Sequence, residues 1–376
     1  MANRRVVALA LAFWSFSGVF CARPQVLVVA PAVPSVTSAV DGIMAAFETH
    51  PLVGIGDWHG MAQEEDFYVE LIKDPRFAKE VGNVVVEFGG AAQQESIDRY
   101  VRGEEIPYEQ LRKVWTELIG FVPTVTGLGY LNFFAQVRSV NAALPPAQQI
   151  HVWLGDPPMD WSKIKTREEA IQVLHERERY PAGLIKAEIL EKQRKALVIY
   201  GTLHFYDENA LKSLVDMAYP NAFFIVTPYI GFQEESCSAA FERATHGWPS
   251  HALATVSGNT ALRNALRASG CRFINESDYH FAPEVTEAER AKALAKWEDE
   301  TSGVAGDAIL YLGEAHSLTI SPMTPDLYLD LAFRKEIDRR RIIMSGHPLA
   351  PTEIVTAQRY LHTYGGAHKM QLGVAR

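Results

Sequence analysis

The stretch that decides the fold reads LVGIGDWHG and spans residues 52–60; it is an apolar run that ends in polar residues. Apolar runs that are continuous rather than alternating are typical of strands buried on both faces of a parallel sheet. With Leu52–Ile55 as the first strand, similar runs follow at Val84–Phe88, Ile150–Leu154, Ala196–Tyr200, Phe223–Thr227 and Ile309–Leu312. The sequence therefore predicts a sheet built from these segments.

Amphipathic stretches of helical length lie between the apolar runs. The predicted helices are Glu64–Val81, Gln93–Tyr100, Tyr108–Leu118, Leu131–Ala143, Arg167–Lys192, Glu208–Ala218, Thr260–Ala268 and Thr286–Trp297. Strands and helices in alternation predict an α/β fold with a mainly parallel central sheet flanked by helices. The long connection from Pro228 to Leu310 predicts a helical insertion or cap at about residues 230–300.

Composition narrows the class of protein. The chain has 376 residues, of which 48% are hydrophobic and 22% charged, so it can bury a large core. With 36 Lys and Arg against 45 Asp and Glu, the net charge of −9 is opposite to that of a nucleic-acid-binding surface. We expect a small-molecule or peptide substrate and no nucleic acid. The charged stretch Arg334–Arg341 predicts a solvated helix face.

The N-terminus has the pattern of an export signal. Arg4 and Arg5 precede the apolar run Val6–Phe16, which is short for a membrane span. We expect residues 1–32 to be a signal peptide or an N-terminal anchor, and residues 33–376 to form a single large α/β domain. The protein would then be exported to the periplasm or the extracellular space, and only the N-terminal segment would contact a membrane.

The cysteines also suit an exported protein. Cys21 lies in the predicted signal or anchor segment, which leaves Cys237 and Cys271. An even pair in an oxidising compartment favours a disulfide between them, although two unrelated buried thiols are the alternative.

Polar side chains follow several of the predicted strands. The pattern Gly-x-x-His occurs at Gly56–His59, Gly201–His204 and Gly313–His316, and Glu87 lies near the end of the strand Val84–Phe88. Because ligands bind at the carboxyl ends of parallel strands, we expect His59, Glu87 and His204 to converge on one site.

Two kinds of chemistry suit this set of residues. His59, Glu87 and His204 could hold a divalent metal such as Zn²⁺, Mn²⁺ or Co²⁺, with positions left open for water. Alternatively, a histidine oriented by Asp57 or Glu87 could act on water without a metal.

Other residues near the strand ends are candidates for substrate binding. They are Trp58, Arg99, Asp156 and Tyr206. Arg99 could orient Glu87 or an anionic intermediate, and an exposed ion pair is the alternative. Gly-x-Ser-x-Gly, His-Glu-x-x-His and Walker A motifs are absent, and His175–Arg179 fails the second of these at its last position.

The motifs resemble those of one known family. The loop Gly56–Gly60 followed by Glu64 and Glu65, the strand end Val85–Phe88 and the segment Asp98–Gly103 resemble the erythromycin-esterase-like proteins. The Gly-x-x-His strand ends are also similar to the wider group of Tiki metalloproteases, TraB-like proteins and ChaN-type haem-uptake lipoproteins. The resemblance covers roughly residues 52–205, and an Asp takes the place of the usual Glu at Asp57.

This resemblance implies a hydrolase of esters, lactones or amides whose site contains His59, Glu87, His204 and Asp57. The alternative within the same group is an uptake protein that binds haem or a metal through His59 or His204, with Tyr206 as an aromatic neighbour.

Overall fold

A computed structural model describes residues 34–119, 127–206, 209–232, 235–269, 288 and 306–349. These residues belong to one compact unit, Val33–Arg376. The predicted signal or anchor segment, Cys21 and Cys271 lie outside the described residues. In the part of the chain that is described, no helix is long and apolar enough to cross a membrane.

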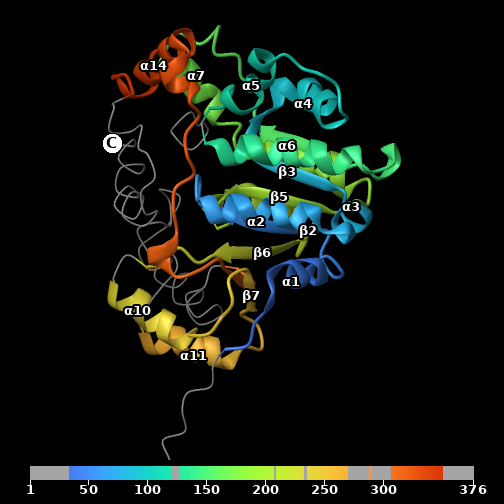
Figure 1. Cartoon of the computed structure of the whole chain (residues 1–376), viewed down its shortest axis with the longest axis vertical. Coiled ribbons are helices and arrows are strands. Elements are labelled where there is room, and N and C mark those ends of the chain that lie inside the picture. The colour runs from blue at the N-terminus through green and yellow to red at the C-terminus, as the bar shows by residue number, and fades with distance from the viewer. Residues whose placement is uncertain are drawn as a thin grey trace, which may run out of the picture. The chain divides into compact units, whose positions relative to one another are not determined.

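The core of the fold is a sheet of eight strands in the order β1-β7-β8-β6-β2-β5-β3-β4 (Figure 1). Six strands correspond to the predicted apolar runs: β2 (Leu52–Asp57), β3 (Asn83–Gly90), β4 (His151–Asp156), β5 (Ala196–Gly201), β6 (Phe223–Pro228) and β8 (Ala308–Tyr311). These six pair in parallel from β8 through to β4. The predicted α/β class is therefore confirmed.

Two short strands at one edge of the sheet were not predicted. They are β1 (Thr37–Ser38) and β7 (Ala252–Thr255), which pair with each other and, through β7, with β8, all antiparallel. The strand β7 lies within the long connection that was expected to be helical, between α10 (Glu235–Ala244) and α11 (Thr260–Ser269). Nearly all of the predicted helix Thr286–Trp297 lies outside the described residues.

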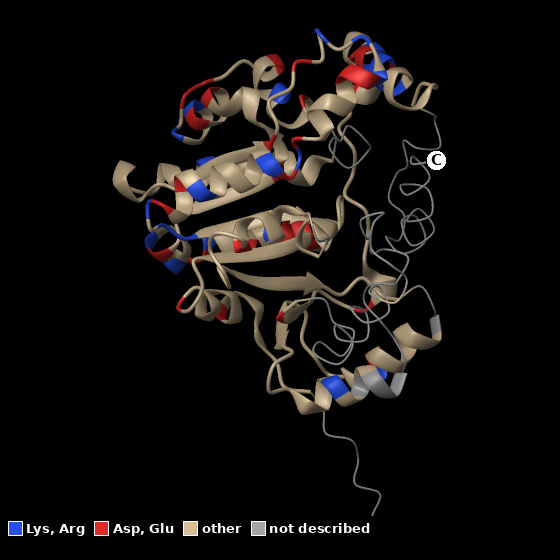
Figure 2. Ribbon diagram, turned by 180° about the vertical axis from the view of Figure 1, so that it is seen from behind, with Lys and Arg blue, Asp and Glu red and all other residues tan. Residues whose placement is uncertain are grey.

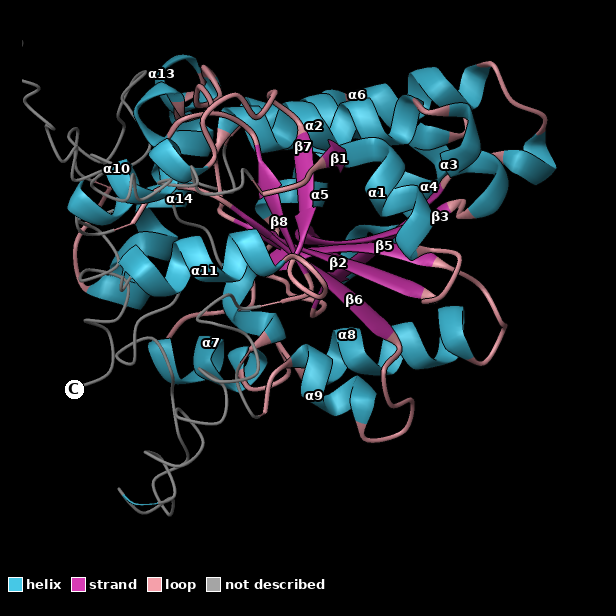
Figure 3. Ribbon diagram, turned by 90° about the horizontal axis from the view of Figure 1, so that it is seen from below, coloured by secondary structure: helices cyan, strands magenta, loops and turns pink. Residues whose placement is uncertain are grey.

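Helices cover both faces of the sheet (Figure 3). One face packs against α1 (Ala39–Ala46), α2 (Ala62–Lys73), α3 (Pro75–Glu80), α4 (Gln94–Val101), α5 (Tyr108–Thr116) and α6 (Leu128–Ala142). The other packs against α8 (Arg179–Leu184), a π-helix at Ile185–Leu190 and α9 (Leu211–Asp216). Each face of the sheet has its own hydrophobic core, and alternate residues of a strand pack into the two. In β3, Val84 and Val86 belong to the first core and Val85 belongs to the second. This explains why the strands are apolar throughout.

Two of the long predicted helices are interrupted. The stretch Glu64–Val81 breaks at Asp74, because Pro75 cannot continue the preceding helix. The side chain of Asp74 accepts a hydrogen bond from the Arg76 N–H at 2.8 Å and so caps the second helix. The stretch Arg167–Lys192 breaks between α7 (Arg167–Leu174) and α8. The turn at this second break carries two residues of the candidate site.

Candidate functional site

The ends of β2, β3 and β5 bring two histidines to either side of one glutamate. The His59 Nε2 lies 3.8 Å from Glu87 Oε2, and the His204 Nε2 lies 3.3 Å from Glu87 Oε1. Since β5 runs between β2 and β3, its last residue, Gly201, lies between the side chains of His59 and Glu87. A Cβ atom at this glycine would lie 3.0 Å from His59 Nε2 and 3.1 Å from Glu87 Oε2, so the glycine keeps this space open.

His59 is held by a buried carboxylate. Its Nδ1 lies 2.7 Å from Asp57 Oδ2, and Asp57 also accepts hydrogen bonds from Tyr68 at 2.7 Å and Tyr130 at 2.6 Å. Burial alone would lower the pKa of His59, but the negative charges of Glu87 and Asp57 outweigh it and raise this pKa above 6.5. The side chain of His59 is 30% exposed, so solvent reaches it. The arrangement gives an oriented imidazole whose Nε2 faces the open space.

Glu87 is the centre of the charge network. It is 5% exposed, its Oε2 accepts the Gly201 N–H at 2.5 Å, and its Oε1 contacts the Arg177 guanidinium. Burial would raise the pKa of Glu87, but Arg177, His204 and His59 together hold it well below its usual range. Glu87 is therefore ionised at neutral pH.

His204 is enclosed by acids. Its Nδ1 lies 2.7 Å from Glu178 Oε1, and Glu178 also accepts the Leu211 N–H at 2.8 Å. Burial would lower the pKa of His204, but Glu87 and Glu178 raise it to about 9. This histidine therefore carries a positive charge at neutral pH. The pKa of His59 is also raised, but His59 is not enclosed between two glutamates.

Arg177 and Glu178 were missed by the sequence analysis. They lie in the turn between α7 and α8, within the predicted helix Arg167–Lys192, where His175–Arg179 was weighed as a zinc motif and rejected. The available signal was a run of alternating charges shortly before Pro181, because a proline is tolerated in the first turn of a helix and here lies near the start of α8. Nothing in the local sequence indicates that this turn folds over the end of β3.

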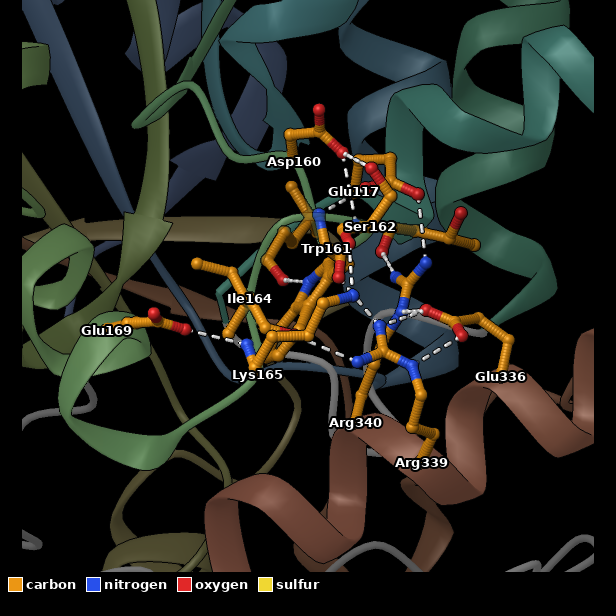
Figure 4. A network of polar contacts seen from close by, with 12 residues as sticks. Glu117, Asp160, Trp161, Ser162, Ile164, Lys165, Glu169, Glu336, Arg339 and Arg340 are labelled. Atoms are coloured by element: carbon orange, nitrogen blue, oxygen red, sulfur yellow. Dashed lines mark hydrogen bonds and ion pairs between the residues drawn. The ribbon is translucent and has the colours of Figure 1, made fainter.

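The loop from β4 to α7 is fixed by the helix α14 (Leu331–Ser345), as Figure 4 shows. Arg339 donates to the carbonyl oxygens of Trp161 at 2.7 Å and Ile164 at 2.9 Å. Arg340, which is 4% exposed, bonds to Glu117 at 2.8 Å and to the Thr116 carbonyl oxygen at 2.6 Å. Although charges of both signs follow one another along α14 (Figure 2), the prediction of a solvated helix face is wrong at Arg340.

Two of the four predicted substrate-binding residues, Asp156 and Trp58, lie at or just after the end of a strand. Asp156, at the end of β4, is buried and accepts the Ile119 N–H at 2.9 Å. Burial raises the pKa of Asp156 to about 7, although Arg177 opposes this. The backbone N–H of Trp58, beside His59, donates to Glu64 at 3.0 Å, and its half-buried ring packs against the core.

The other two predicted substrate-binding residues are Arg99 and Tyr206. Arg99 forms an exposed ion pair with Glu104 at 2.8 Å, so Arg177 and not Arg99 is the arginine that contacts Glu87. The hydroxyl of Tyr206 lies 2.5 Å from that of Thr227.

A hollow of about 510 Å³ lies beside this region. It is lined by Pro157, Pro158, Ile164, Glu169, Gln172, Val173, Glu176 and Tyr180. Pro157 directly follows Asp156, and Glu176 directly precedes Arg177. The wall of the hollow is thus continuous along the chain with the buried Asp156 and the half-buried Arg177.

Two more carboxyl groups lie behind His59, in the first turn of α2. Glu64 and Glu65 are both buried. Burial raises the pKa of Glu65 to about 8, with a smaller rise from Asp57, and it raises the pKa of Glu64 well above its usual value. Glu65 is therefore mostly protonated at neutral pH.

The donor set does not fit a metal ion held by His59, Glu87 and His204. Both carboxylate oxygens of Glu87 are taken, one by Arg177 and the other by the Gly201 N–H, and a metal at His204 would also have to displace its proton. A guanidinium in contact with Glu87 would also repel a divalent cation. Among the described residues, no group of three or more His, Cys, Asp or Glu side chains is arranged to hold a metal.

Comparison with known proteins gives little further information. No family model matches the chain, and no curated protein matches it. A solved structure of the type III effector HopBA1 is 15% identical, and the match covers 61% of this chain and 94% of HopBA1 with a TM-score of 0.36. A Bacillus cereus protein is 11% identical, covering 74% of this chain and 99% of that one with a TM-score of 0.40. Similarities this low carry no argument about activity, and the family resemblance stays a prediction.

Proposed function

We propose that the protein is a hydrolase in which His59, oriented by Asp57, removes a proton from water that attacks the carbonyl carbon of an ester, lactone or amide. The observation that carries this proposal is the geometry of His59. Its Nδ1 is bonded to Asp57 at 2.7 Å, while its Nε2 is 3.8 Å from Glu87, too far for a hydrogen bond. A water molecule at Nε2 would be within reach of a general base.

Both proton transfers of the reaction are assigned to His59. His59 Nε2 takes one proton of the water, the hydroxide oxygen bonds to the carbonyl carbon, and the resulting imidazolium is stabilised by Asp57 and Glu87. The imidazolium then returns the proton to the leaving oxygen or nitrogen as the bond to carbon breaks. Arg177 contacts the other oxygen of Glu87, and its positive charge opposes the rise that Glu87 causes in the pKa of His59.

The Tyr68 and Tyr130 hydroxyls have a part in this proposal. They donate to both oxygens of Asp57, which holds this carboxyl group aligned with the imidazole. An aligned acid fixes the tautomer of its histidine partner, with the proton on Nδ1 and the lone pair on Nε2.

Haem binding, the alternative that the sequence suggested, stays a prediction.

Export of the protein is supported by one cysteine. Cys237 is disulfide-bonded, and disulfides persist mainly in oxidising compartments. The predicted partner, Cys271, lies outside the described residues. We therefore retain the periplasm or the extracellular space as the proposed location.

The proposal is tested with the purified full chain and a panel of aryl esters, lactones and anilides. His59→Gln should lower kcat/KM on any substrate found by about 10²–10⁴-fold, because a general base contributes that much. The matched control is His316→Gln, since His316 also belongs to a Gly-x-x-His segment but is 62% exposed and pairs only with Glu314 among the described residues. Equal activity of the His59 and His316 variants, with both folded, would contradict the assignment of His59 as the base.

A further inference from the structure

Glu64 is a buried acid that has no part in the proton transfers assigned to His59. It lies in the first turn of α2 and has no exposed surface. A carboxyl group in such a place is costly unless it is hydrogen-bonded, and Glu64 Oε2 accepts the backbone N–H of Trp58 at 3.0 Å. Because Trp58 directly precedes His59, this bond joins the buried acid to the segment that carries the proposed base.

His59 lies in a tight turn of the backbone. The N–H of Met61 donates to the carbonyl oxygen of Trp58 at 3.1 Å, which closes a four-residue turn over residues 58–61. Gly60 is the third residue of this turn and has a φ of 80°, the left-handed conformation that the third residue of a type II turn adopts. His59 is the second residue, so the direction of its side chain depends on how the turn is held.

The sheet does not provide an acceptor for the N–H of Trp58. The paired part of β2 ends at Asp57, opposite Gly201, and α2 does not begin until Ala62. A backbone N–H that leaves a sheet inside the protein needs another acceptor. The side chain of Glu64 supplies it.

Glu64 contacts the turn at both of its ends. The backbone N–H of Glu64 donates to the Met61 carbonyl oxygen at 3.1 Å, while its side chain accepts from Trp58. Met61 is the N-cap residue of α2 and makes no side-chain cap bond. In a capping box, the third residue of a helix reaches back to the N–H of the N-cap. Glu64 is the third residue of α2, but its side chain reaches past Met61 to Trp58 and so holds the turn.

The residue on the other side of His59 is also anchored. The N–H of Gly60 donates to the Tyr130 hydroxyl at 3.1 Å, and its carbonyl oxygen accepts the Ser321 N–H at 2.8 Å. The backbone is therefore bonded to other elements immediately before and immediately after His59, and Glu64 provides the bond before it.

We propose that Glu64 is a positioning residue that holds the turn 58–61 through the Trp58 N–H, so that the imidazole of His59 stays aligned with Asp57. Since Glu64 has no exposed surface, it acts through the backbone and does not touch the substrate. The effect on turnover rests on the proposed hydrolase function, whereas the restraint on the turn does not.

Two variants separate this hydrogen bond from the bulk of the side chain. Glu64→Gln keeps a carbonyl oxygen that can accept the Trp58 N–H, and Glu64→Met has a similar length without that oxygen. Hydrogen exchange at the Trp58 amide of the full chain, followed by NMR, should be about tenfold faster in Glu64→Met and close to the wild-type rate in Glu64→Gln. The amide of Ile55, in a strand paired on both sides, corrects each rate for a change in overall stability.

Turnover provides the second readout. On a substrate found for the wild-type protein, Glu64→Met should lower kcat by about tenfold with little change in KM, and Glu64→Gln should retain most of kcat. The matched control is Asp66→Asn, which changes an exposed acid of the same helix and should equal the wild type in both readouts.

A wild-type Trp58 amide that exchanges as fast as an exposed, unbonded amide overturns the proposal, even if Glu64→Met does not fold. Corrected exchange in Glu64→Met equal to that of the wild type also overturns it, and so does exchange in Glu64→Gln as fast as in Glu64→Met. Faster exchange with an unchanged kcat removes the role in positioning His59. If the exchange results are as expected but no ester, lactone or amide is hydrolysed, the proposed function fails and the restraint on the turn stands.

Discussion

Replacing Glu65 with glutamine should remove much of the loss of stability that the protein suffers as the pH rises. Glu65 is 3% exposed, and burial raises its pKa from 4.5 to about 8. Between these two values the folded state keeps the proton that the unfolded state has lost. The folded state thus binds more protons, so the free energy of unfolding falls as the pH increases through this range.

The size of the effect follows from the two pKa values. Their difference, about 8 minus 4.5, corresponds to about 5 kcal/mol at roughly 1.4 kcal/mol for each pH unit. Between pH 5 and pH 8.5, most of this, about 4 kcal/mol, should be lost by the wild-type protein through Glu65 alone. Glu65→Gln resembles the protonated acid in shape, so its stability should decline less steeply by about that amount.

The assay is urea unfolding of the full chain, followed by circular dichroism at closely spaced pH values. The exposed Glu48→Gln serves as the control, and its profile should run parallel to that of the wild-type protein. Asp156, another buried acid with a raised pKa, is present in all three proteins and so cancels in the comparison. The charge of Glu65 adds a minor part of the rise in the pKa of Glu64, so this part is lost in Glu65→Gln. If Glu65→Gln declines in parallel with the wild type, then Glu65 is not protonated in the folded state and the reasoning about this buried cluster is wrong.

Three further predictions concern the site and the disulfide. Gly201→Ala should lower kcat/KM by at least about tenfold with little change in the melting temperature, because its methyl group would lie 3.0 Å from His59 Nε2; activity equal to the wild type would refute this. Exhaustive chelation should leave activity unchanged, and activity should rise with pH through a pKa above 6.5, since His59 must be neutral to act as a base; loss of activity on chelation that added metal reverses would refute the metal-free mechanism. Peptide mapping of the unreduced protein should find Cys237 linked to Cys271, and because the two are 271 − 237 = 34 residues apart, reduction should cost about 3–4 kcal/mol of stability; free thiols at both positions would contradict the pairing.

The sequence by itself determined the parallel strands and the identity of the residues at their ends. A strand buried on both faces must be apolar along its whole length, and this makes a pattern that can be recognised locally. Because parallel strands end at the same edge of a sheet, the positions of Asp57, His59, Glu87 and His204 along the chain are enough to group them. The antiparallel strands β1 and β7 have two and four residues, too few to show a pattern.

Only the tertiary structure decided how the charges of the site are paired. Arg177 reaches Glu87 from 90 residues further along the chain, and no spacing rule connects a turn between two helices with the end of a distant strand. The same holds for Tyr68 and Tyr130, which read as ordinary core residues on the apolar faces of their helices. Burial raises the pKa of Glu65, and the neighbouring Glu87 and Glu178 raise that of His204; burial and these contacts are both properties of the packed chain. The choice between a metal and a histidine base therefore depends on contacts that form only when the helices pack on the sheet.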